Sequence, residues 1–116
     1  MDIAKTLITL SQSIGVSGAE HNELENSSSK TALRLLKDYT NDAYIDDFGS
    51  VIGFIGDRDN GKKTLLLDAH IDEIGLVVTY IDDDGFIKVG NVGGIDRRLL
   101  LAQTVVIHGK KAVLGV

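Results

Sequence analysis

The spacing of apolar residues in this chain changes near residue 43 from the period of a helix to the period of a strand. Before that point, apolar side chains recur every three or four residues and form one face of a helix. After it, apolar and polar residues alternate over short runs separated by turn residues. A chain of 116 residues with this order of patterns predicts an α/β fold of modest size.

Two helices are predicted in the first part of the chain. The first covers residues 3–14, with Asp2 as its N-cap and Gly15 as the residue that ends it. The second covers residues 20–38, although the serines at 27–29 lie in its middle. Serine side chains compete for backbone hydrogen bonds, so they weaken a helix at that point.

Strands are predicted over most of the remaining chain, at residues 44–47, 51–56, 64–70, 75–81, 86–90, 104–108 and 112–116. The intervening turns are residues 48–49, 59–62, 82–85 and 109–111. Three consecutive leucines, Leu65 to Leu67, indicate a strand covered on both faces, as in a sheet flanked by helices. Shorter and more closely spaced strands follow residue 73, which favours a domain boundary there.

Charge and composition exclude several classes of protein. The net charge of −5 argues against nucleic acid as the main partner. The absence of cysteine excludes disulfides and thiolate metal sites. Because no apolar run approaches the length of about 20 residues that spans a bilayer, no membrane association is expected. No signal peptide is recognised, and a cytoplasmic location is predicted.

The candidate site lies in the segment Asp68-Ala69-His70-Ile71-Asp72-Glu73-Ile74-Gly75. In a strand, Asp68, His70 and Asp72 would share one face, at the carboxyl end where open α/β sheets place their ligands. His70 would bind a metal ion, and Asp72 could hold the other N–H of the imidazole ring. The alternative is that His70 is a hydrogen-bonded surface residue and that Asp72 and Glu73 are solvated loop acids.

The same segment resembles the first metal motif of the di-metal glutamyl and deblocking aminopeptidases, which include the tetrahedral aminopeptidases and proteins labelled endoglucanase M. Further stretches resemble the family in the same order along the chain. They are Gly15-Val16-Ser17-Gly18, Asp47-Phe48-Gly49-Ser50-Val51-Ile52, Ile81-Asp82-Asp83-Asp84-Gly85-Phe86, Val92-Gly93-Gly94-Ile95-Asp96, Leu101-Ala102-Gln103-Thr104-Val105 and Ile107-His108-Gly109-Lys110-Lys111. Ser50 stands where asparagine is common in the family, and Ala102 where glycine is usual.

The resemblance implies a metal-dependent aminopeptidase with two divalent ions, often zinc or cobalt, and a peptide substrate. Residues 1–72 would open the α/β catalytic domain, and residues 73–116 would begin an inserted, small β-barrel-like domain that drives homo-oligomer formation. In the family, the histidine matching His70 ligates a metal and the aspartate matching Asp72 orients it, so Asp72 is the candidate catalytic-site residue.

The remaining ligands and the catalytic glutamate of that family have no counterpart here. We therefore expect an N-terminal fragment that is inactive alone and holds at most one ion weakly. The alternative is a non-catalytic assembly module that acts through exposed β edges.

Overall fold

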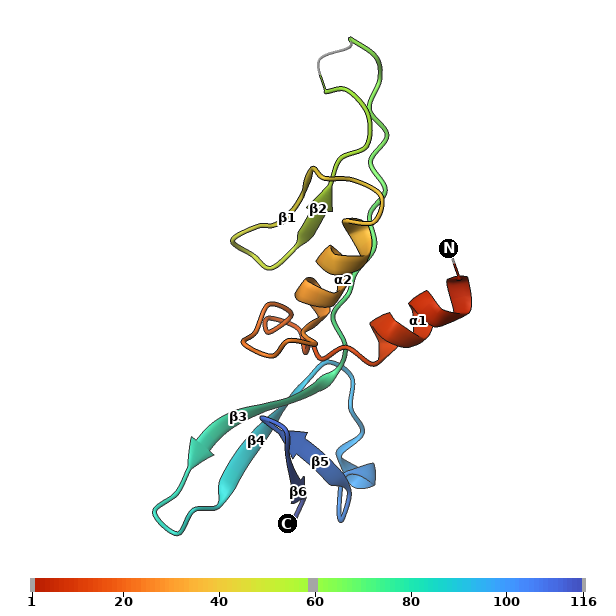
Figure 1. Cartoon of the computed structure of the whole chain (residues 1–116). Coiled ribbons are helices and arrows are strands. Elements are labelled where there is room, and N and C mark those ends of the chain that lie inside the picture. The colour runs from red at the N-terminus through yellow and green to blue at the C-terminus, as the bar shows by residue number, and fades with distance from the viewer. Residues whose placement is uncertain (1, 59–60, 116) are drawn as a thin grey trace.

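The computed structural model describes residues 2–58 and 61–115, which form two α-helices, one short 3-10 helix and three antiparallel hairpins (Figure 1). The hairpins are β1–β2, β3–β4 and β5–β6, so each described strand pairs with its neighbour in sequence. The prediction of mixed helix and strand is confirmed. The elements are α1 Ile3–Ser11, α2 Ser28–Leu36, β1 Ala43–Ile45, β2 Val51–Gly53, β3 Gly75–Ile81, β4 Ile87–Val92, η1 Arg97–Leu99, β5 Thr104–Ile107 and β6 Lys110–Val113.

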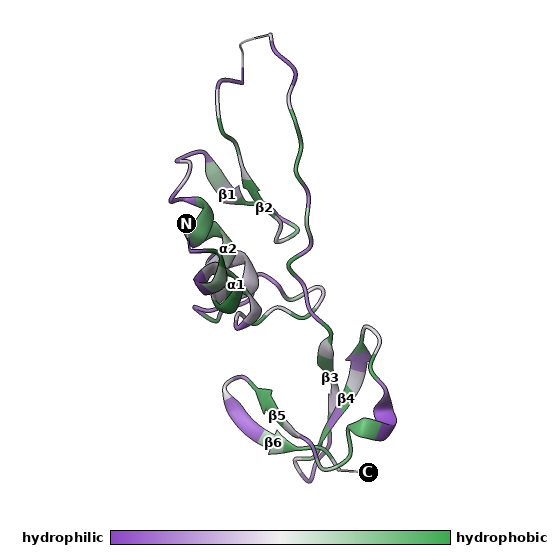
Figure 2. Ribbon diagram, turned by 90° about the vertical axis from the view of Figure 1, so that its right-hand side faces the viewer, coloured by the Kyte–Doolittle hydropathy of each residue, from purple (hydrophilic) through white to green (hydrophobic). Residues whose placement is uncertain are grey.

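The molecule is elongated, with principal dimensions of 61 × 29 × 24 Å. Helix α2 contacts α1, β1 and β2 in one part of the molecule, and the hairpins β3–β4 and β5–β6 form the other part (Figures 1 and 2). These two hairpins are separate two-stranded sheets. Closure of residues 73–116 into a barrel-like domain, and a domain boundary near residue 73, therefore stay predictions.

Helix α1 begins as predicted but ends three residues early. The Asp2 side chain accepts a hydrogen bond from the Lys5 backbone N–H at 3.1 Å, as an N-cap should. Ser11 is the last helical residue, because the chain turns and the Ile14 N–H donates to the Asn26 carbonyl at 2.9 Å. Ile14 therefore lies outside the helical face to which its spacing assigned it.

Helix α2 is much shorter than the predicted helix over residues 20–38. Ser27 is its N-cap, with a side chain that accepts from the Lys30 N–H, and the helix starts at Ser28. The buried Ser29 hydroxyl donates to the Gly49 carbonyl at 2.5 Å and ties the helix to the β1–β2 loop. The serines thus begin the helix, as their preference for caps favours, instead of weakening its middle.

The predicted strand over residues 64–70 is wrong. The segment runs extended down the molecule (Figure 1), but none of its residues belongs to a described strand. The side chains of Leu65, Leu66 and Leu67 are 82–85% exposed, so they are not covered on both faces. A strand needs a hydrogen-bonded neighbour, and the apolar run alone does not supply one.

The last two hairpins lie close to their predicted positions. Strand β4 ends two residues later than expected, and β6 begins at Lys110 instead of residue 112. Strand β6 begins early because its turn has only two residues, His108-Gly109, with φ values of 47° and 77°. Ile107 is therefore paired with Lys110. Two residues of the predicted turn at 59–62, Asp59 and Asn60, and the end of the predicted last strand, Val116, lie outside the described residues.

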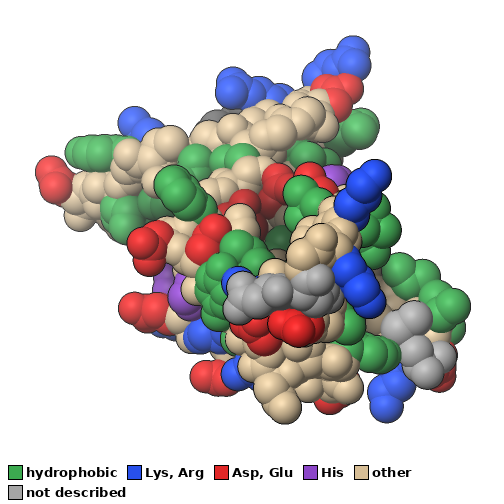
Figure 3. Space-filling model, turned by 90° about the horizontal axis from the view of Figure 1, so that it is seen from above, with side chains coloured by type: hydrophobic (Ala, Val, Ile, Leu, Met, Phe, Trp, Pro, Cys, Tyr) green, Lys and Arg blue, Asp and Glu red, His purple; other side chains and the backbone are tan. Residues whose placement is uncertain are grey.

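The described residues enclose no apolar core. Their buried side chains are polar and cluster around the start of α2, at Ser13, Ser27, Ser28, Ser29 and Thr31. Apolar side chains instead lie open on the surface, and Figure 3 shows several on the face seen from above. Within the described ranges, neither helix has the length and apolar character needed to cross a bilayer.

Candidate metal centre

His70 and Asp72 form a hydrogen-bonded pair on the segment that leads into β3. The ring Nδ1 of His70 lies 3.0 Å from Asp72 Oδ1 and 3.2 Å from the Asp72 carbonyl oxygen. The His70 side chain is 86% exposed, and that of Asp72 is 34% exposed. The strand that would have aligned them is absent, so the pair forms through local backbone geometry.

This contact fixes the tautomer of a neutral His70 ring. Both oxygens near Nδ1, one from an ionised carboxylate and one from a carbonyl, can only accept hydrogen bonds. Nδ1 must therefore carry the proton and donate it, which leaves the lone pair on Nε2. No described residue is hydrogen-bonded to Nε2. Its lone pair is therefore free to coordinate a divalent metal ion.

Ser17 holds the other oxygen of the same carboxylate. Its hydroxyl donates a hydrogen bond to Asp72 Oδ2, while Oδ1 faces the His70 ring. The Ser17 hydroxyl, and then the His70 ring, hold the pKa of Asp72 below its ordinary value of 3.8. Asp72 is therefore ionised at neutral pH, as an acceptor of both hydrogen bonds should be.

The loop that carries Ser17 is joined to the site segment by backbone hydrogen bonds. The Glu73 N–H donates to the Gly15 carbonyl at 2.8 Å, and the Ser17 N–H donates to the Glu73 carbonyl at 3.4 Å. Val16 and Glu73 thus form an isolated parallel bridge. A Cβ atom on Gly75 would lie 2.3 Å from Val16 Cγ2, so a larger residue there would require Val16 to move.

An open groove of about 590 Å³ lies beside the pair. Residues of α1, α2, the β1–β2 loop, β2 and the segment 66–72 line it, and His70 and Asp72 lie on its wall. The groove thus places a polar pair next to apolar surface, which is the usual composition of a ligand site. Among its apolar residues are Leu10, Leu35, Leu36, Leu66 and Leu67.

The described part of the chain does not complete a metal site. It contains no group of three or more histidine, cysteine, aspartate or glutamate side chains placed to hold one ion. Asp68, predicted to share a face with His70 and Asp72, makes no hydrogen bond with either of them. His70 and Asp72 are brought together, and Ser17 joins them; the stretch Gly15-Val16-Ser17-Gly18 resembles the family, but that resemblance predicts no role for Ser17.

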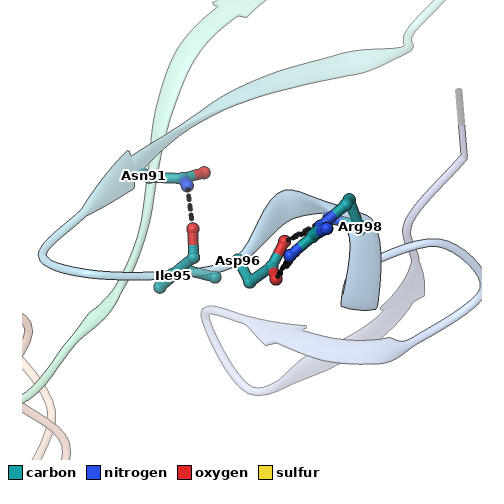
Figure 4. Close-up of polar contacts among 4 residues, drawn as sticks. All are labelled: Asn91, Ile95, Asp96 and Arg98. Atoms are coloured by element: carbon teal, nitrogen blue, oxygen red, sulfur yellow. Dashed lines mark hydrogen bonds and ion pairs between the residues drawn. The ribbon is translucent and has the colours of Figure 1, made fainter.

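A second polar cluster lies between β4 and η1 (Figure 4). Arg98 donates from Nε to Asp96 Oδ1 at 2.9 Å and from Nη2 to Asp96 Oδ2 at 2.6 Å. Nearby, the Asn91 side-chain amide donates to the Ile95 carbonyl at 3.1 Å. These contacts all lie within the connection between β4 and η1. The cluster therefore stabilises that loop, and the Asp96 carboxylate is already engaged by Arg98.

Comparison with known proteins identifies the class to which this fold belongs. Residues 49–116 match the family model of the M42 glutamyl aminopeptidases, which are peptidases and therefore hydrolases. The match covers more than half of the chain and includes His70 and Asp72. The chain belongs to the M42 glutamyl aminopeptidase family.

This chain resembles part of the solved structures of tetrahedral (TET) and related aminopeptidases. PhTET1-12s, a dodecamer, superposes with a TM-score of 0.70 at 35% identity over 90% of this chain. The aminopeptidase APDkam598 from the archaeon Desulfurococcus kamchatkensis gives 0.66 at 31% identity over 92%. A TET aminopeptidase from a marine-sediment thaumarchaeon gives 0.67 at 25% identity over 87%. The chain spans only 26–29% of the length of these proteins.

Proposed function

We propose that this chain supplies one metal ligand and its orienting carboxylate to a metal-dependent aminopeptidase that releases N-terminal residues from peptides. The observation that carries the proposal is the His70–Asp72 pair, in which Nδ1 donates to the carboxylate and Nε2 is left open. Carboxylate–histidine pairs of this kind hold catalytic zinc in many enzymes. Membership of the aminopeptidase family supports the reaction class.

In this proposal His70 binds one of two divalent ions, zinc or cobalt, through Nε2, and Asp72 orients the ring. Two bound ions would lower the pKa of a water molecule and polarise the scissile carbonyl. The exposed His70 ring and the groove beside it leave room for a peptide and for ligands from other segments.

The other ligands and the general base are proposed to come from polypeptide outside these 116 residues. Two facts support this: the described residues bring no three donor side chains together, and the related structures are far longer than this chain. A single histidine does not make a di-metal centre, since catalytic zinc sites keep about three protein ligands. The chain alone should then be inactive and hold at most one ion weakly.

A chimera tests the role of His70. Residues 1–116 would replace the matching part of the related aminopeptidase that is 35% identical, and hydrolysis of aminoacyl-p-nitroanilides would be measured with added zinc or cobalt. His70→Ala should abolish activity, and Asp72→Asn should lower it about 10- to 100-fold, as for other residues that orient metal ligands. The matched control, His21→Ala, should keep it. Full activity of the His70→Ala chimera would remove His70 from the metal site.

Assembly into a homo-oligomer is the second part of the proposal. The related PhTET1-12s is a dodecamer, and this chain exposes apolar side chains on both faces of the β3–β4 hairpin. Such surfaces are typical of protein–protein interfaces. If assembly were the only function, as in a non-catalytic module, the His70→Ala chimera would keep its oligomeric state and the unsubstituted chimera would show no hydrolysis.

A further inference from the structure

We propose that Ser17 is a positioning residue for the metal site: its hydroxyl fixes the Asp72 carboxylate, which in turn fixes the His70 ring. The inference rests on the proposed role of His70 and adds a residue from a distant part of the chain. Ser17 acts through Asp72 alone, since its hydrogen bond goes to Oδ2 and the ring contact goes to Oδ1.

The Asp72 side chain needs such a second contact because it is not held by burial. About a third of its surface is exposed, and the His70 ring is almost entirely in solvent. A carboxylate in that setting can rotate, and its two oxygens are chemically equivalent. Occupation of Oδ2 by the Ser17 hydroxyl leaves one oxygen, Oδ1, at a defined position for Nδ1 of His70.

The position of Ser17 is itself set by close backbone packing. The Val16–Glu73 bridge holds the loop against the site segment through two hydrogen bonds. On the other side of the loop, a Cβ on Gly15 would lie 1.6 Å from Ser28 Oγ, so the start of α2 presses directly on the loop. Ser17 is thus held between a helix and the site by contacts that do not involve its own side chain.

The tautomer of His70 in the metal-free 116-residue chain measures this positioning. Long-range ¹H–¹⁵N correlation of the histidine rings reports which nitrogen carries the proton at a pH where the ring is neutral. The chain without substitutions should have His70 mainly protonated at Nδ1, in contrast to His21 and His108. In Ser17→Ala the carboxylate is free to rotate away from the ring. The Nδ1–H to Nε2–H ratio should then fall about threefold or more, the effect of losing the one net hydrogen bond between Nδ1 and Asp72 Oδ1.

Two controls separate positioning from loss of structure. Slow exchange of the Glu73 amide, which donates to the Gly15 carbonyl, shows that the loop is still docked in each variant. Ser17→Thr keeps the hydroxyl and should keep the ratio of the unsubstituted chain. The inference is overturned if Ser17→Ala leaves the ratio unchanged, if Ser17→Thr lowers it while the Glu73 amide stays protected, or if His70 has the ratio of His21 and His108.

The two proposals fail in different experiments. An unchanged tautomer ratio in Ser17→Ala would remove Ser17 from the site and leave the chimera test of His70 unaffected. Conversely, full activity of the His70→Ala chimera, together with a lowered ratio in Ser17→Ala, would overturn the metal-ligand role and keep the positioning contact.

Discussion

Asp46 and Asp82 close two hairpin loops with the same set of hydrogen bonds. Asp46 Oδ1 accepts from the backbone N–H groups two and four residues later, at 2.9 and 2.8 Å, and Asp82 Oδ1 does the same at 3.1 and 2.8 Å. In both loops the fourth residue is a glycine, Gly49 or Gly85, with φ near 85°. One loop chemistry therefore builds both turns, which join β1 to β2 and β3 to β4.

Replacement of Asp82 by alanine should destabilise the β3–β4 hairpin. Two backbone N–H groups lose their acceptor, and we expect a loss of about 1 kcal/mol in the free energy of unfolding. Urea unfolding followed by circular dichroism measures the change. Asp83→Ala is the matched control, because that carboxylate accepts no hydrogen bond from the described residues. Equal stability of the two variants would contradict the prediction.

Ala102→Gly should raise stability, because Ala102 has a left-handed backbone with φ of 62°. That conformation destabilises the folded state by about 1–2 kcal/mol for a non-glycine residue. Glycine removes this strain, but its greater freedom stabilises the unfolded chain by about 0.4–1 kcal/mol, which offsets part of the gain. A net gain of about 0.5–1 kcal/mol in unfolding free energy is expected. The same change in a strand, Ala112→Gly, should lower stability. A loss in Ala102→Gly would show that the strain is absent.

The Asp96–Arg98 pair should make a pH-dependent contribution to stability. The Arg98 guanidinium and its backbone N–H lower the pKa of Asp96 from its ordinary value of 3.8. Because the folded pKa is the lower one, the contribution is present above pH 3.8 and is lost as the pH falls through the folded pKa. Titration of the Asp96 carboxyl by ¹³C NMR should give a midpoint below 3.8. Arg98→Gln should raise that midpoint, whereas Arg97→Gln should not.

The 116-residue chain should associate in solution. Leu65, Leu66 and Leu67 and the open hairpin edges expose apolar surface and unpaired backbone groups, and burial of apolar surface is worth about 25 cal/mol per Å². Sedimentation velocity at micromolar concentration should show a dimer or a larger species. Leu66→Lys should shift the distribution towards monomer. A compact monomer that unfolds cooperatively would contradict the prediction.

Sequence patterns predicted the local parts of the fold well and the rest poorly. The β3–β4 hairpin was predicted because its strands and its turn lie next to each other in sequence. The helix predicted over residues 20–38 was too long because Ser27 is its N-cap, so the helix starts only at Ser28. Whether a serine caps a helix or lies within it depends on the conformation of the residues before it. The strand over residues 64–70 failed because an apolar run carries no information about its hydrogen-bonding partner.

The candidate site shows the same division. His70 and Asp72 are two residues apart, so their pairing followed from spacing, even though the strand invoked to align them is absent. Ser17 is 55 residues from Asp72, and only the folded chain brings it there. A serine within a glycine-containing loop is too common in sequences to point to a carboxylate that far away.

The bridge between Val16 and Glu73 also sets the order in which the site can assemble. The hairpins close over short loops, whereas the contact of Ser17 with Asp72 must close a loop of 55 residues, which carries a larger entropy cost. Helix α2 and the β1–β2 hairpin can therefore form first. On the ribosome, the loop of residues 15–18 is synthesised well before Asp72, so the contact between Ser17 and Asp72 cannot form until 55 further residues have been added.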